Sequence, residues 1–345
     1  MTIRSSIQLN SRILTQLPEL KAIAAEWRNL CERCGSTPFQ YPEWIIPWAG
    51  EFSPDCISVI EVRSRNVLVG IAPLLIYPRG NERVLAFMAG GVSDYLDVLV
   101  DSEYESEIIS ALLDSFSRLD NWTTLDLTDL PPSSVLHRAV TGFVPSPHDQ
   151  CSSVPLPATA GELLQHLSKR QRANVRQSRS RIERAGGGSI ETATAETLPE
   201  FLEDLFRLHT SRWHRDGQPG VLADEGIKAF HRNAAPELLS QGILRLCRLR
   251  LRVRTIAVVY TLVSNSTVFC YSQGYDPEFA DLSPGTFLMF SAMEDAISSG
   301  MKKFDMLRGD EAYKKHWKPE IQITQRVHCD RATVKSMCER DFAAA

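Results

Sequence analysis

Two halves of the sequence share one order of elements, and this repeat limits the folds that the chain can adopt. Alternating apolar residues predict strands, and apolar residues at helical spacing predict amphipathic helices. In the first half the predicted elements are a helix at 17–34, strands at 56–64, 66–78, 83–89 and 95–100, a helix at 102–119 and a strand at 122–130. In the second half they are helices at 197–217 and 224–242, strands at 243–251, 254–264 and 267–276, a helix at 283–300 and a strand at 302–307. The sequence therefore predicts an α/β fold of mixed sheets in two tandem domains.

A proline-rich segment at 145–160 is the predicted boundary between these domains, because clustered Pro and Ser residues interrupt both periodicities. The predicted domains are 1–150 and 160–345. A chain of 345 residues is long enough to give each domain its own core.

Composition narrows the classes of partner and location. The formal net charge of −4 argues against a generic binder of polyanions. The N-terminal segment lacks the apolar run of a signal peptide, and no stretch approaches a membrane span, so we expect a cytoplasmic protein. Cys31 and Cys34 form a C-x-x-C pair, but no second ligand pair accompanies them, so we expect no metal site.

The start of the helix at 283–300 is the first candidate site. Ser283 is a good N-cap residue, and Pro284 suits the first helical position because it lacks an N–H group. The following amides, from Gly285 and Thr286, face whatever lies beyond the helix end, where the helix dipole favours an anion. A plain capped helix is the alternative. The matching helix of the first half starts with an acidic segment, 101–107, so we expect an anionic donor to bind only the second half.

A basic segment at 167–188 is the second candidate site. It carries seven basic residues and one acid between Lys169 and Arg184. At helical spacing Lys169, Arg172, Arg176 and Arg179 share one face, which predicts either a phosphate-bearing or polyanionic partner or a solvated helix surface. Aromatic side chains that could stack on bases are missing from the segment, which disfavours RNA.

The segment 309–319 is the third candidate site, because it crowds charged and aromatic residues behind a buried strand that contains Asp305. An acid within an apolar strand needs partners or a cleft. We expect Asp310 to cap a short helix on which Tyr313 and Trp317 share a face, as do Asp310 and Lys314. A structural corner with a surface ion pair is the alternative.

Arg212 and Trp213 cluster at the end of the predicted helix 197–217, with Gly217 as its C-cap. We expect these two side chains to contribute to substrate binding, although Trp213 suits a core position equally well.

Three segments resemble a known family of enzymes: 212–220, 275–289 and 304–317. They are similar to the Gcn5-related N-acyltransferase (GNAT) superfamily, to the Fem-type peptidoglycan aminoacyltransferases, and most of all to the CelD-like acyltransferases associated with exopolysaccharide synthesis. The resemblance covers about 160–325. It implies a degenerate GNAT-like domain at 1–150 and a GNAT-like acyltransferase domain at 160–345.

The resemblance also implies roles for the candidate residues. Ser283, Pro284, Gly285 and Thr286 would hold the pyrophosphate or phosphate of an acyl donor. The usual GNAT signature of Gln or Arg followed by spaced glycines is missing, which leaves acyl-CoA, an acyl carrier protein or aminoacyl-tRNA as donor. No tightly bound cofactor is expected.

The expected reaction is direct transfer of an acyl group from a thioester to an amine or hydroxyl of a small molecule or sugar. Lys314 would stabilise the oxyanion, Tyr313 would protonate the leaving thiolate, and Asp305 would complete the catalytic set. The expected substrate-binding residues are Arg172, Arg176, Arg179, Arg212, Trp213 and Trp317. A tRNA-dependent aminoacyltransferase and a non-catalytic accessory protein of polysaccharide synthesis remain alternatives.

Overall fold

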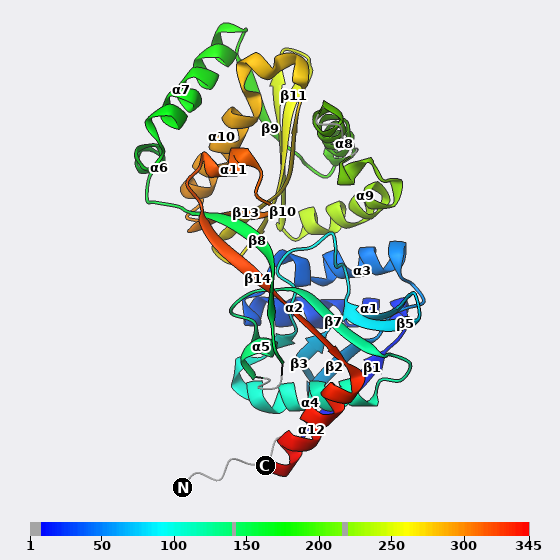
Figure 1. Ribbon diagram of the computed structural model, residues 1–345. Helices are drawn as coiled ribbons and strands as arrows, with labels where there is room; N and C mark the ends of the chain where they lie inside the picture. Colours follow the sequence, from blue (N-terminus) through cyan, green and yellow to red (C-terminus); the bar gives the residue numbers. More distant parts are fainter. Residues whose placement is uncertain (1–7, 140–142, 216–219, 345) are drawn as a thin grey trace. The chain divides into compact units, whose positions relative to one another are not determined.

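The computed structural model describes the chain outside residues 1–7, 140–142, 216–219 and 345 (Figure 1). Two compact units divide it. The first consists of residues 1–149 and 323–345, and the second consists of residues 150–322.

The first unit contains helices and strands in alternation. In chain order they are β1 (Leu9–Leu14), α1 (Leu17–Ala22), α2 (Ala24–Cys34), α3 (Pro42–Phe52), β2 (Val59–Ser64), β3 (Val67–Ala72), β4 (Leu74–Arg79), β5 (Glu82–Phe87), β6 (Leu99–Val100), α4 (Glu105–Arg118), β7 (Thr124–Leu130), α5 (Val135–Ala139), the start of β8 (Ser146–Pro155), the end of β14 (Glu320–Asp330) and α12 (Arg331–Ala344). Strands β1, β2, β3 and β6 form an antiparallel sheet against which α4 packs. Strands β4, β5, β7 and β14 are neighbours in that order, with β5 and β7 parallel.

The second unit is built around one mixed sheet. Its elements are the end of β8, α6 (Ala160–His166), α7 (Lys169–Arg184), β9 (Gly188–Thr192), α8 (Leu198–Arg215), α9 (Glu225–Ser240), β10 (Leu244–Leu251), β11 (Arg254–Ser264), β12 (Thr267–Tyr275), α10 (Pro284–Ser298), β13 (Lys303–Arg308), α11 (Ala312–Lys315) and the start of β14. The strand order is β8-β13-β12-β11-β10-β9, and only β12 and β13 run parallel.

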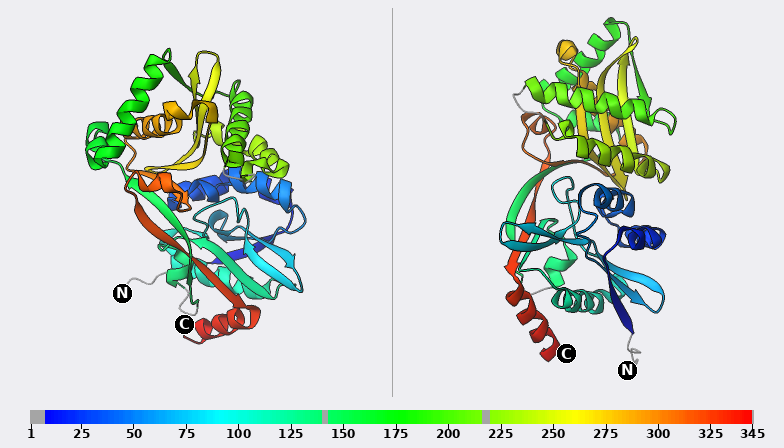
Figure 2. Two further views of the ribbon diagram at one scale, coloured as in Figure 1. Left: turned by 45° about the horizontal axis from the view of Figure 1, so that its top comes forward. Right: turned by 90° about the vertical axis from the view of Figure 1, so that its right-hand side faces the viewer.

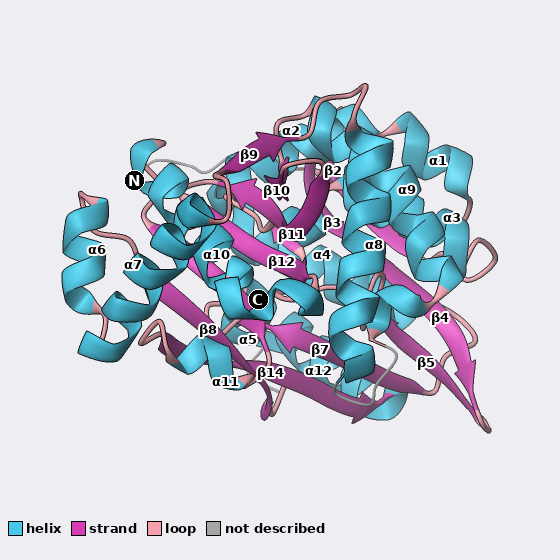
Figure 3. Cartoon of the chain, turned by 90° about the horizontal axis from the view of Figure 1, so that it is seen from above, coloured by secondary structure: helices cyan, strands magenta, loops and turns pink. Residues whose placement is uncertain are grey.

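Helices cover both faces of this second sheet. Figure 2 shows the yellow strands between the orange helix α10 and the green to yellow-green helices α8 and α9. Figure 3 shows α7 and α10 on one side of β10–β12, and α8 and α9 on the other. The α10 side forms one continuous core in which Val175 and Ile182 of α7 meet Leu288 and Met293 of α10. This three-layer arrangement confirms the predicted α/β fold with mixed sheets.

The strands β8 and β14 connect the two units differently from the sequence-based boundaries. β8 starts within the first unit and pairs with β13 of the second, whereas β14 starts within the second and pairs with β7 of the first. The predicted boundary segment 145–160 thus holds a strand, because Pro145 and Pro157 lie outside it and Pro147 and Pro155 lie near its ends. The residues 323–345 group with the first unit, and the domains at 1–150 and 160–345 remain a prediction.

A buried histidine makes the stability of the second unit sensitive to acid. His231 of α9 is fully buried, and its ring lies 5.5 Å from that of Tyr260 and 5.3 Å from that of Tyr271. Burial, with a smaller contribution from His209, lowers the pKa of His231 to about 3. Between pH 6.5 and 3 the unfolded chain therefore binds more protons than the folded one, and stability falls as the pH falls.

We expect this histidine alone to cost about 2 kcal/mol of stability at pH 5 relative to pH 7. Urea unfolding of the wild type and of His231→Phe across this pH range measures the effect. The variant should show a shallower pH dependence because phenylalanine cannot take up the proton. Identical pH slopes for the two proteins would contradict a neutral, buried His231.

None of the helices in the described part of the chain is both long and apolar enough to cross a membrane.

Candidate active site

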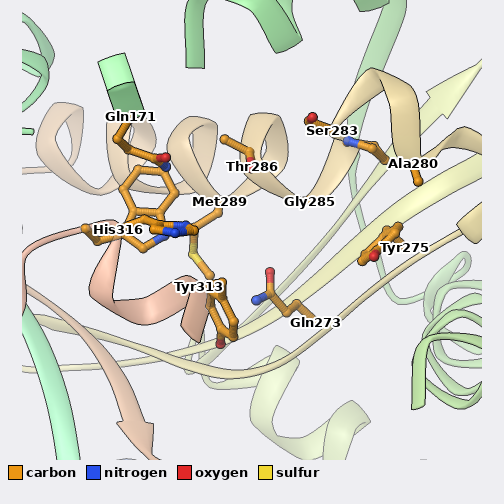
Figure 4. A pocket seen from close by; sticks show the side chains of 12 residues that line it. Gln171, Gln273, Tyr275, Ala280, Ser283, Gly285, Thr286, Met289, Tyr313 and His316 are labelled. Carbon is orange, nitrogen blue, oxygen red and sulfur yellow. The ribbon is translucent and has the colours of Figure 1, made fainter. Parts of the chain in front are cut away.

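A cavity of about 310 Å³ lies in the second unit, between β12, the start of α10 and α11 (Figure 4). Its lining residues are Gln171, Gln273, Tyr275, Ala280, Ser283, Pro284, Gly285, Thr286, Met289, Tyr313, His316 and Trp317. Four elements far apart in sequence thus contribute to one concave site, which is typical of a ligand pocket.

The cavity exists because two parallel strands separate. β12 and β13 pair only from Thr267 and Lys303 to Phe269 and Asp305. β12 then continues to Tyr275 without β13 beside it. The part of β12 beyond the last pair lines the cavity together with α10 and α11.

A β-bulge directs the side chains of β12 into this space. Ser272 lies opposite Tyr260 and Cys270 lies opposite Thr261, so Tyr271 is an extra residue in the strand. Cys270 faces the α10 side before the bulge, and Gln273 and Tyr275 line the cavity on that side after it. The bulge therefore reverses the alternation of the strand and supplies two polar side chains to the cavity.

Gly274 is a residue of β12 that faces α8 after the bulge, and it allows α8 to lie close to the strand. A Cβ atom at Gly274 would lie 2.6 Å from the backbone nitrogen of His209 and 2.6 Å from the carbonyl carbon of Leu208 in α8. Only glycine allows α8 to pack this closely against β12, and this packing fixes the direction of its neighbours Gln273 and Tyr275.

The start of α10 forms one wall of the cavity. Ser283 occupies the N-cap position with left-handed backbone angles (φ 53, ψ 50), and its hydroxyl does not cap the helix. The expected side-chain cap is therefore wrong: the chain enters from a 3-10 turn at Pro277–Leu282, and the left-handed residue makes the bend. Phe287 donates the first helical hydrogen bond back to Ser283, so the amides of Gly285 and Thr286 precede it and have no helical partner.

Electrostatics at this helix start favour an anion. The first turn of α10 contains no acidic residue. The corresponding helix of the first unit, α4, has Glu105 and Glu107 in its first turn. Since the positive end of the dipole is masked by acids only in α4, the contrast predicted from the sequence is present in the structure.

Helix α11 forms the opposite wall. Tyr313 is partly exposed, His316 is exposed, and Trp317 is buried with its ring stacked on Phe290 of α10 at 6.5 Å. The stacking anchors the end of α11 to the core, so that Tyr313 is held toward the cavity (Figure 4).

Lys314 points away from the cavity into the corner between β13 and α11. Its ammonium is almost fully buried and donates to three carbonyl oxygens, those of Leu307, Arg308 and Gly309. It also lies 2.9 Å from the carboxylate of Glu311. This ammonium therefore holds α11 on the end of β13, and its predicted contact with an oxyanion remains untested.

The predicted cap of α11 and the predicted ion pair on it are wrong. Glu311, rather than Asp310, occupies the N-cap position, and no side chain caps the helix. Lys314 pairs with Glu311, while Asp310 lies 3.7 Å from Lys315. The helix begins one residue later than expected, so Asp310 lies outside it and Glu311 is the carboxylate beside Lys314.

Asp305 has no exposed surface and does not line the cavity. Its carboxylate accepts the amide hydrogen of Leu307 at 2.9 Å and lies 3.3 Å from the ammonium of Lys303. These contacts account for the burial of an acid in this strand. A catalytic role of Asp305 stays a prediction that the observed contacts do not support.

The predicted substrate-binding residues lie in different surroundings. Arg172 donates to the carbonyl of Gln165, Arg179 pairs with Glu294 at 2.8 Å, and Arg176 is exposed. Arg212 and Trp213 belong to the last turn of α8, and their side chains lie outside the described part of the structure. Among the predicted substrate-binding residues whose side chains the structure describes, only Trp317 lines the cavity.

Six lining residues were not predicted: Gln171, Gln273, Tyr275, Ala280, Met289 and His316. Gln171 lies on the buried side of α7. The prediction for this helix rested on its exposed basic residues, and their pattern gives no signal for Gln171. His316 and Met289 stood within segments already chosen, and their helical spacing from Tyr313 and Thr286 was a usable signal.

Metal and thiol chemistry have little support at the cavity. Asp129, His148 and Asp149 of the first unit each bring a ligand atom within 4.8 Å of the others, but the cavity is lined by the second unit alone. Burial raises the pKa of the Cys34 thiol to about 11 and that of Cys31 further, so the C-x-x-C pair is held as thiols.

The cavity lies within a recognisable type of domain. Residues 169–315 match a family model described as an acetyltransferase (GNAT) domain, and this range includes all lining residues except His316 and Trp317. The match covers most of the second unit, which is thus similar to GNAT acetyltransferase domains, in agreement with the resemblance of its motifs.

Solved structures agree on the fold. FemX superposes with a TM-score of 0.65 at 13% identity, over 92% of this chain and 96% of that chain. The C-terminal domain of a putative lysylphosphatidylglycerol synthetase from Agrobacterium fabrum gives 0.59 at 13% identity, over 92% and 95%. L-PGS from Bacillus licheniformis gives 0.59 at 10% identity, over 91% and 94%. No curated protein matches the sequence significantly. At these identities the structures share the fold with this chain, and a shared fold does not fix an activity.

Proposed function

We propose that the protein is an acyltransferase that moves an acyl group from a thioester donor to an amine of a small molecule or sugar. One observation carries the proposal. The start of α10, whose first turn contains no acidic residue, forms a wall of the cavity inside the GNAT-like domain. The same site could also transfer the acyl group to a hydroxyl of the acceptor. We further propose that it acts in the cytoplasm and belongs to the CelD-like type.

The donor would lie along the space between β12 and β13. Its phosphate would accept hydrogen bonds from the amides of Gly285 and Thr286, and its arm would pass Gln273. The described lining residues include neither a cysteine nor a carboxylate. A nucleophile activated by a base and an acid therefore has no support within this lining, which favours direct transfer over a covalent acyl-enzyme.

Tyr313 is the proposed acid of the reaction. Its side chain lines the cavity, on the wall that faces Gln273 (Figure 4). A phenol at this place can protonate the thiolate that leaves when the amide forms.

We expect Tyr313→Phe to lower kcat by about 100-fold and to leave the donor KM nearly unchanged, since general acid catalysis contributes about 10²–10⁴. Steady-state kinetics with the donor at saturation measure both values. Lys315→Ala, a change of an exposed residue on the same helix, is the control and should be silent. A full kcat for Tyr313→Phe would exclude the phenol as the acid.

The first alternative is a tRNA-dependent aminoacyltransferase, favoured by the exposed cations of α7 and by the fold that the chain shares with FemX. The second is a non-catalytic accessory protein of polysaccharide synthesis, which rests on the CelD-like resemblance.

The donor decides between these functions. Acyl-CoA, an acyl carrier protein and aminoacyl-tRNA should each be incubated with a panel of amines and amino sugars, with and without ribonuclease. The proposal expects acceptor-dependent release of a free thiol that ribonuclease does not affect. Transfer that ribonuclease abolishes would support the first alternative, and no product from any donor would support the second.

A further inference from the structure

We propose that the start of α7 docks the acidic carrier protein of the donor, and that Gln171 receives the pantetheine arm which this carrier inserts into the cavity. The inference rests on the proposed use of the cavity by a thioester donor. It assigns the donor to a carrier protein instead of free CoA.

The exposed face of α7 has cations without partners. The side chains of Lys169, Arg170 and Arg176 are exposed and form neither an ion pair nor a hydrogen bond with any described residue. Two other arginines of the helix differ, since Arg172 donates to the carbonyl of Gln165 and Arg179 pairs with Glu294. The available charge therefore lies on the outward face, where Lys169 and Arg176 are seven residues apart and point the same way.

These cations are not explained by the stability of the helix. The first turn of α7 contains no acidic residue, and Ser168 caps it through a bond from the amide of Gln171. Lys169 and Arg170 lie at the positive end of the helix dipole, where a cation is unfavourable. Cations at a helix start lower the stability of the helix, so their presence here is better explained by binding to an anionic partner.

The same turn of α7 reaches the cavity. Gln171 lines the cavity and is only 5% exposed. Its side chain is directed into the space above His316 and Met289 (Figure 4). Its carbonyl oxygen accepts a long bond from Asn174 at 3.5 Å, while its amide nitrogen has no hydrogen-bond partner among the described residues. An amide donor on a largely buried side chain, facing a cavity, suits an amide carbonyl of a pantetheine arm.

The spread of the cations indicates the kind of partner. Lys169 and Arg176 are about 10 Å apart along the axis. One phosphate group cannot neutralise charges over this length. A row of carboxylates on a helix of a carrier protein can. RNA is the less favoured polyanion because α7 presents no aromatic side chain for base stacking.

The test compares one probe with and without its protein part. The probes are an octanoyl acyl carrier protein and octanoyl-pantetheine. The variant is Lys169→Glu/Arg176→Glu, and its control is Arg252→Glu/Lys302→Glu, which makes the same charge change at exposed residues of the second unit. Fluorescence anisotropy of labelled holo-carrier gives binding as a function of salt, and thiol release gives kcat/KM for both probes.

We expect the variant to bind the carrier at least about tenfold more weakly and to flatten the salt dependence, because charge complementarity supplies the association. Its kcat/KM for octanoyl-pantetheine should stay within about twofold of wild type. The control should bind the carrier like the wild type.

Equal weakening in variant and control, or none in either, would overturn the docking surface. Tighter binding of unacylated tRNA than of the carrier, lost in the same variant, would also overturn it in favour of RNA. A wild type that binds the carrier but turns over neither probe would contradict the proposed function, while the docking surface would still be supported.

Gln171→Leu should raise the KM for octanoyl-pantetheine about tenfold. An unchanged KM would show that Gln171 does not contact the pantetheine arm.

Discussion

Replacing Gly285 by aspartate is expected to weaken donor binding by about 10- to 100-fold while the fold is retained. The carboxylate would stand in the first turn of α10, beside the amides that the donor's phosphate is proposed to occupy. It would repel the phosphate and mask the helix dipole, as Glu105 and Glu107 do in α4 of the first unit. Isothermal titration with acyl-CoA and with acyl-pantetheine phosphate measures the loss.

Gly285→Ala separates charge from space in this experiment. A Cβ at Gly285 would have Tyr275 as its nearest neighbour at 3.6 Å, which is an ordinary contact. We therefore expect the alanine variant to bind the donor like the wild type. Equal affinities of the alanine and aspartate variants would remove the phosphate from this helix start.

Replacing Lys314 is expected to cause the largest loss of stability, about 3 kcal/mol for Lys314→Ala. The change would leave three buried carbonyl oxygens and the Glu311 carboxylate without their shared donor. Lys315→Ala, which removes an exposed ammonium one residue later, should cost less than about 0.5 kcal/mol. Urea unfolding of the two variants measures the difference.

The kinetics of Lys314 variants distinguish a positioning role from a catalytic one. If Lys314 acts by holding α11, then Lys314→Ala displaces Tyr313 and Trp317, and both kcat and the donor KM worsen. Lys314→Arg, which keeps the charge, should restore part of both. A variant that keeps wild-type stability and donor KM but loses about 10²–10³ in kcat would instead support contact with the oxyanion. Equally small effects at Lys314 and Lys315 would contradict both roles.

The helix start at Ser283–Thr286 was predictable because its signal is local. A proline at the first helical position and the missing acids can be read from four consecutive residues, and the structure places this segment at the cavity. The conformation of Ser283 was not predictable, since its left-handed backbone depends on the preceding 3-10 turn.

The two cavity residues of β12, Gln273 and Tyr275, could not be predicted because of the bulge in this strand. Simple alternation along the strand would put Gln273 and Tyr275 on the face opposite Cys270. The extra residue Tyr271 brings them to the same face. A bulge depends on the pairing between two strands, which the sequence of one strand does not encode.

Lys314 shows the limit of helical spacing as a guide to function. Spacing correctly places Tyr313 and Trp317 together at the cavity. It cannot show that the neighbouring ammonium turns back to the carbonyl oxygens at the end of β13, because these come from a segment outside the helix. The strands β8 and β14 were missed for a similar reason, as their pairing partners lie more than a hundred residues away.

A crystal structure with a non-reactive thioether analogue of acyl-pantetheine phosphate tests the central claim most directly. The account predicts that a phosphate oxygen lies within hydrogen-bond distance of the amides of Gly285 and Thr286, and that the sulfur lies between Gln273 and Tyr313. An analogue bound elsewhere, with the start of α10 in contact with solvent alone, would contradict the account.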